Sequence, residues 1–130
     1  MKAYTDLNQS KKLAEILPIE SADMYYFRQI DDDYFPPNVE SICPIPLFKD
    51  GREDFKYDIP CWSLSALVEV IPKRIKEYNV LRTDLSIIDF SIWYDELGYG
   101  VNTELPDITM KCPVDACYKM IVTLNELKIL

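Results

Sequence analysis

Hydrophobic and polar positions along the chain follow two different periods, which predicts both helices and strands. Between Ser63 and Ile71, apolar residues recur at offsets of three, four and seven, the spacing of one helix face. Pro60 precedes this segment, Pro72 follows it, and the Ser63 side chain is of the type that caps a helix N-terminus. The pattern predicts a helix over residues 63–71, with Trp62 packing back over its first turn as a hydrophobic staple does.

Two other segments have the same helical spacing. Residues 7–17 follow Thr5 and Asp6, either of which can cap a helix, and a proline ends the segment. Residues 113–127 begin with a proline, the residue favoured at the first helical position, and carry an apolar stripe to their end. We therefore expect helices at about 7–17, 63–71 and 113–127.

Strands are predicted where apolar and polar residues alternate. The strongest alternation lies in residues 85–94, and residues 99–105 alternate again after a turn, so the two predict a hairpin over about 85–105. In residues 85–94 the alternation predicts a buried face made by four apolar residues, Ile88, Phe90, Ile92 and Tyr94.

Two weaker strand signals precede the central helix. Residues 24–30 are rich in aromatic side chains and have the length of a strand. Residues 42–59 contain two apolar runs around Asp50-Gly51, a turn signal, so they predict a second hairpin. Prolines in its first run predict that this hairpin lies at a sheet edge or is frayed. Together the patterns predict one α+β domain over residues 1–130, with an antiparallel sheet packed by three helices.

Composition narrows the classes of partner. The chain has 130 residues, 48% of them hydrophobic and 28% charged, which are ordinary globular values. Its 14 basic and 22 acidic residues give a net charge of −8, which disfavours binding to nucleic acid because the field of the molecule repels phosphate. Lys73, Arg74 and Lys76 form a single short basic cluster. The same charge leaves open an acidic nucleic-acid mimic that blocks a host defence enzyme.

The first residues contain no apolar stretch of the kind found in a signal peptide, and no run approaches the length of a membrane span. We therefore expect a cytoplasmic protein with no membrane partner. In that compartment the cysteines are expected to be reduced thiols.

The sequence shows few residues in the patterns typical of catalytic or metal sites. The chain has no histidine, which removes the usual general base near neutral pH. Asp31–Asp33, and Asp95 with Glu96, contain ligands for a divalent cation, but neighbouring carboxylates in a strand or turn point apart. The spacing of the cysteines is not that of the usual zinc sites: Cys43, Cys61, Cys112 and Cys117. We expect no enzyme activity and no cofactor, with a small metal-binding protein or enzyme as an alternative.

Trp93 is the first candidate for a partner surface. By strand parity it shares a face with Asp89 and Ser91, opposite the predicted buried face, and an exposed tryptophan is a typical interface anchor. Alternatively, a helix covers that face, or Trp93 packs on its cross-strand neighbour. Tyr99, in the predicted return strand, is the second candidate. The expected partner is an unidentified protein, or a second copy of the chain in a homo-oligomer.

Three segments of the chain resemble proteins of one family. They are residues 59–67 closed by Ile71-Pro72, residues 113–127, and residues 9–26. These segments resemble an uncharacterised family of small proteins encoded by phages and prophages of Bacteroides-type gut bacteria. The resemblance implies an origin in a mobile element and implies no activity or catalytic residue. The leading interpretation is a non-enzymatic accessory protein of a phage or prophage that acts through protein–protein contacts.

Overall fold

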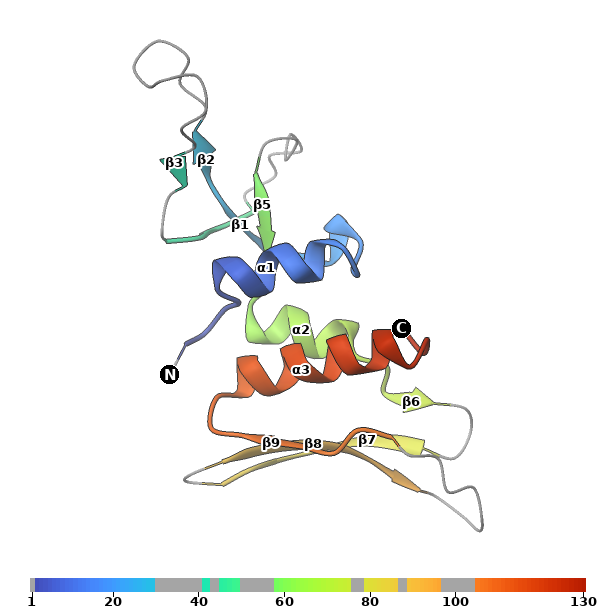
Figure 1. Cartoon of the computed structure of the whole chain (residues 1–130). Coiled ribbons are helices and arrows are strands. Elements are labelled where there is room, and N and C mark those ends of the chain that lie inside the picture. The colour runs from blue at the N-terminus through green and yellow to red at the C-terminus, as the bar shows by residue number, and fades with distance from the viewer. Residues whose placement is uncertain are drawn as a thin grey trace.

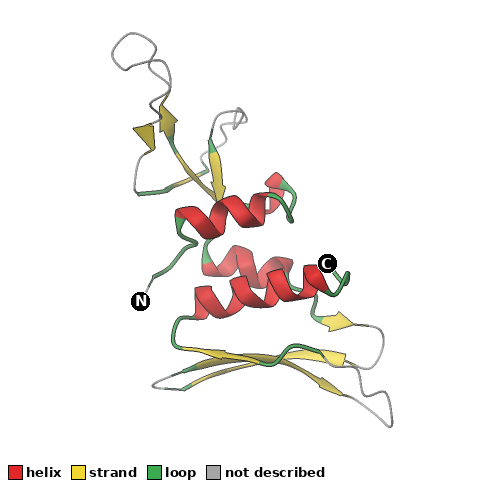
Figure 2. Ribbon diagram, in the orientation of Figure 1, coloured by secondary structure: helices red, strands yellow, loops and turns green. Residues whose placement is uncertain are grey.

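The chain folds into helices and short antiparallel strands (Figures 1 and 2). The computed structural model describes residues 2–29, 41–42, 45–49, 58–75, 79–86, 89–96 and 105–130. The helices are α1 (Leu7–Ala14), α2 (Leu64–Val70) and α3 (Pro113–Glu126), with a 3-10 turn η1 (Ile19–Ser21) after α1. The strands are β1 (Met24–Tyr26), β2 (Arg28–Gln29), β3 (Ser41–Ile42), β4 (Leu47–Phe48), β5 (Ile59–Cys61), β6 (Arg74–Ile75), β7 (Asn79–Leu85), β8 (Phe90–Glu96) and β9 (Ile108–Met110).

The strands form several sheets rather than the single sheet expected from the sequence. One sheet has the order β4-β1-β5, another has the order β6-β7-β8-β9, and β2 pairs with β3 as a two-stranded ribbon. Every pairing between described strands is antiparallel. The predicted α+β class, with three helices packed on antiparallel strands, is therefore confirmed, and the number of sheets is corrected.

The elements lie in layers (Figure 1). Helix α3 lies over one face of the sheet β6–β9, α2 packs against α3, and α1 lies farther from this sheet, next to β5. The main core fills the space between these layers, with Leu13 from α1, Leu67 from α2, Ile121 from α3 and Ile92 from β8 all fully buried. A smaller buried cluster lies under the sheet β4–β1–β5: Met24, Tyr26, Ile59 and Cys61.

Local capping signals place the helix starts where the sequence predicts them. The Asp6 carboxylate accepts from the backbone N–H of Gln9 at 2.8 Å, and the Gln9 side chain accepts from the backbone N–H of Asp6 at 3.1 Å, which forms a capping box. The Ser63 hydroxyl oxygen accepts from the Ala66 N–H at 3.2 Å at the start of α2. Trp62, next to that cap, is fully buried in the main core. Helix α1 ends at Ala14, three residues before its predicted end.

The predicted strand over residues 85–94 is wrong at its beginning. A turn closes between Ser86 and Asp89, where the Ser86 N–H donates to the Asp89 carbonyl at 2.8 Å and the Asp89 N–H donates to the Ser86 hydroxyl at 2.9 Å. Leu85 therefore ends β7, and Phe90 begins β8. Serine and aspartate favour such turns because their side chains bond to nearby backbone groups.

In the sheet itself, β8 pairs with β7 on one side and with β9 on the other. The return strand predicted over residues 99–105 lies outside the described residues except for Leu105, which belongs to no strand. The predicted buried face is confirmed for Phe90, Ile92 and Tyr94 of β8, whereas Ile88 lies outside the described residues.

The hairpin predicted within residues 42–59 is also corrected. Ile42 belongs to β3, which pairs with β2. The strands β4 and β5 both pair with β1, which lies between them, and the predicted turn at Asp50-Gly51 lies outside the described residues. Each residue of β1 is buried, which suits a central strand, whereas β5 contains Pro60 and Pro46 directly precedes β4. Proline cannot donate a hydrogen bond to a neighbouring strand, so these two segments suit the edges.

Candidate functional site

Trp93 lies on the outward side of the sheet β6–β9. Residues directly opposite each other in an antiparallel pair project from the same face. The register pairs Trp93 with Arg82, Asp95 with Val80, and Ser91 with both Asp84 and Thr109. We call this side of the sheet the outer face. Along β8 and β9, its residues alternate with buried residues. The residues of the outer face are Arg74, Val80, Arg82, Asp84, Ser91, Trp93, Asp95 and Thr109.

No described helix or strand covers the outer face, because α2 and α3 lie on the other side of the sheet (Figure 1). Arg82, Asp84 and Thr109 are exposed on it, while Trp93 is half-buried. Of the two alternatives to a partner surface, a covering helix is therefore not found among the described elements. The cross-strand neighbour of Trp93 is Arg82.

Polar contacts hold Trp93 in place on this face. Its indole N–H donates to the Asp95 carboxylate at 2.8 Å, two residues further along β8. The other carboxylate oxygen of Asp95 lies 3.3 Å from Nε of Arg82. The Asp95 carboxylate thus bridges the tryptophan and the arginine, which limits the rotamers of both side chains. Ser91 and Thr109 are linked on the same face by a 2.9 Å hydrogen bond.

The other candidate residues from the sequence are distributed differently. Tyr99 and Asp31–Asp33 lie outside the described residues, as does the side chain of Glu96. Asp95 is engaged by Trp93 and Arg82, so it is not a free cation ligand.

The described residues of the basic cluster, Lys73 and Arg74, have different surroundings. The Lys73 ammonium donates to the carbonyls of Val68 and Ile71 at the end of α2, where a cation complements the helix dipole. Arg74 lies on the outer face, and Lys76 lies outside the described residues. The described part of the cluster therefore does not form a continuous cationic strip for a phosphate backbone.

The three described cysteines do not gather into a ligand set. Cys61 belongs to the smaller buried cluster, Cys117 to the main core, and Cys112 is half-buried at the start of α3. Burial raises the pKa of Cys61 and raises the pKa of Cys117 to about 11, so both are held as thiols near neutral pH. Cys43 lies outside the described residues, and no group of three or more potential metal ligands occurs in the described part of the chain.

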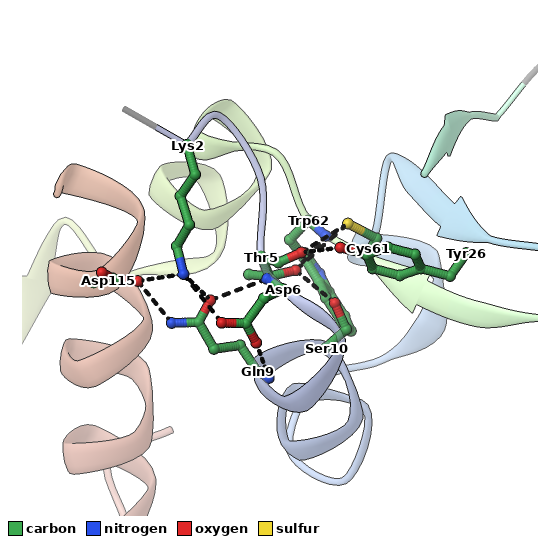
Figure 3. Close-up of polar contacts among 9 residues, drawn as sticks. All are labelled: Lys2, Thr5, Asp6, Gln9, Ser10, Tyr26, Cys61, Trp62 and Asp115. Carbon is green, nitrogen blue, oxygen red and sulfur yellow. Dashed lines mark hydrogen bonds and ion pairs between the residues drawn. The ribbon is translucent and has the colours of Figure 1, made fainter. Parts of the chain in front are cut away.

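A buried polar cluster centred on Thr5 was not foreseen from the sequence (Figure 3). The Thr5 hydroxyl lies 2.7 Å from the Ser10 hydroxyl and accepts from the backbone N–H of Trp62 at 3.2 Å. The Thr5 carbonyl accepts from the Tyr26 hydroxyl at 2.7 Å, and the Cys61 thiol donates to the same carbonyl at 3.4 Å. Thr5 and Ser10 are fully buried. Burial also raises the pKa of Tyr26, the Cys61 thiol adding to the effect, so its hydroxyl remains protonated and can donate.

The polar groups of the Thr5 cluster satisfy one another, so this cluster has a structural role. It joins the first residues of the chain to α1, β1 and β5. The N–H of Thr5 also donates to the Trp62 carbonyl at 2.9 Å, and Tyr4 forms a β-bridge with Ser63. Buried polar groups that are fully paired are typical of a fixed arrangement rather than of a reactive one.

A second polar junction lies nearer the surface, between the N-terminal segment and α3 (Figure 3). The Lys2 ammonium lies 2.6 Å from the Asp115 carboxylate and 3.2 Å from that of Asp6, and the Gln9 amide donates to Asp115 at 2.8 Å. Burial favours the neutral form of Lys2, but its hydrogen bonds to Asp115 and Asp6 outweigh that effect and raise its pKa. For Asp115, burial acts to raise the pKa, but hydrogen bonds from Lys2 and Gln9 outweigh it and lower the pKa.

Comparisons with known proteins add no identification. No protein-family model, curated protein or solved structure matches the chain. In the described part of the chain, no helix has the length and apolar character needed to cross a bilayer.

Proposed function

We propose that this protein binds a protein partner through the outer face of the sheet β6–β9, with Trp93 as the anchor of the contact. The observation that supports this proposal is the placement of a tryptophan on a sheet face that no described element covers, beside an ordered arginine–aspartate pair. Tryptophan and arginine are the residue types most enriched among side chains that dominate binding energy.

We further propose that the protein is non-enzymatic and acts as an accessory protein of a phage or prophage. The resemblance of the segments 9–26, 59–67 and 113–127 to phage and prophage proteins supports that setting. Among the described residues, two of the groups that could do chemistry are engaged in structural contacts. The Cys61 thiol donates to the Thr5 carbonyl, and the Asp115 carboxylate pairs with Lys2.

An acidic mimic of nucleic acid is less well supported. Such a mimic needs a row of carboxylates that are free to stand in for phosphates. Asp6 and Asp115 are paired with Lys2, and Asp95 is paired with Arg82. These contacts pair three described carboxylates with cations, so those three are not free to imitate phosphates.

The proposal is tested by affinity capture from a lysate of a Bacteroides-type host, followed by binding measurements with the purified captured protein. Trp93→Ala removes the anchor and is compared with Lys119→Ala, which truncates an exposed residue of α3. We expect Trp93→Ala to weaken binding by about 2 kcal/mol or more, roughly a 30-fold rise in Kd. Lys119→Ala should bind like the wild type.

Thermal unfolding of both variants provides the necessary control. Trp93 is only half-buried, so Trp93→Ala should remain folded, with a free energy of unfolding lowered by about 1 kcal/mol. Wild-type affinity in a folded Trp93→Ala variant, for every captured protein, would show that Trp93 does not anchor the contact. Sedimentation of the wild type and of Trp93→Ala distinguishes a separate partner from a second copy of this chain.

A further inference from the structure

We draw no further inference here: the strongest candidate, the exposed apolar side chains of Ile45, Leu47 and Phe48 along and before the edge strand β4, carries nothing because no feature of the described residues shows what covers them.

Discussion

The Thr5 cluster predicts a large effect from a small substitution, Thr5→Val. Valine has nearly the shape of threonine, so the substitution removes the hydroxyl and leaves no large cavity. The Trp62 N–H then loses the acceptor that lies 3.2 Å away, and the Ser10 hydroxyl loses its partner at 2.7 Å. Both groups lie in the fully buried region around Thr5, where water cannot replace the lost contacts.

The magnitude follows from the cost of leaving a buried polar group unpaired, about 1–3 kcal/mol for each group. For the two groups affected, we expect Thr5→Val to lower the free energy of unfolding by about 2–6 kcal/mol. Urea acts with a slope of about 1–3 kcal/mol per molar for small domains, so at a slope of about 2 kcal/mol per molar the midpoint should fall by roughly 1–3 M.

Urea unfolding followed by far-UV circular dichroism measures this change. Thr5→Ser keeps the hydroxyl and should be destabilised by only about 1 kcal/mol, through the lost methyl group. Ser65→Ala, at an exposed position of α2, should stay within about 0.5 kcal/mol of the wild type. A Thr5→Val/Ser10→Ala double variant should lose less than the sum of its single variants, because no hydroxyl is then left unpaired.

A Thr5→Val variant that unfolds within about 0.5 M of the wild-type urea midpoint, with an unchanged slope, would refute this role of the Thr5 hydroxyl. A double variant whose loss equals the sum of the single losses would also contradict it, because the two hydroxyls would then be independent.

Two other predictions concern the ionisable side chains. The lowered pKa of Asp115 stabilises the fold above the unfolded-state pKa, near 3.8, and this stability is lost as the pH falls through the folded-state pKa. Asp115→Asn should therefore lower the free energy of unfolding at pH 7 by about 0.5–1 kcal/mol, after allowance for solvent screening. This loss of stability relative to the wild type should become smaller below about pH 4. Asp107→Asn, at an exposed position, serves as the charge-matched control, and an Asp115→Asn difference that is equal at pH 3 and pH 7 would contradict the ion pair. Native protein treated with iodoacetamide at pH 8 should be alkylated at Cys112 far faster than at Cys61 or Cys117, because the latter two are buried and their pKa values are raised. Peptide mapping by mass spectrometry measures the rates, and alkylation of Cys117 as fast as that of Cys112 would show that the α3 core is open.

The parts of the fold that the sequence predicts well depend on neighbouring residues. The cap at Ser63 and the helical spacing after it lie within a few residues, and α2 forms at Leu64–Val70 as these signals require. The face of β8 that holds Phe90, Ile92 and Tyr94 follows from the alternation alone.

Strand pairing could not be predicted in the same way, because it depends on contacts between distant segments. The pairing of β1 with both β4 and β5 joins residues near 25 to residues near 48 and 60. A turn signal at Asp50-Gly51 favours pairing of its flanking runs and says nothing of a third strand that lies between them. The turn from Ser86 to Asp89 was missed because the two isoleucines at 87 and 88 continue the apolar pattern of the predicted strand.

The candidate site also depends on contacts between distant segments. Placement of Trp93 on the face opposite the buried residues of β8 follows from strand parity, whereas its polar neighbour Arg82 comes from another strand. The weak alternation of residues 79–85 could have indicated that strand, but its register on β8 depends on the turn. The Thr5 cluster joins residues 56 positions apart, and no local pattern indicates such a contact.

Site-specific cross-linking tests the proposed outer face most directly. A photo-cross-linking amino acid replaces Thr109 or Asp84, both exposed on the outer face, or Lys119, which is exposed on α3. Each variant is irradiated in a host-cell lysate, and cross-linked products are resolved by mass. The proposed function predicts a shared product from positions 84 and 109 that is absent from position 119 and is lost when Trp93→Ala is added. A product from position 119 with none from positions 84 and 109 would contradict it.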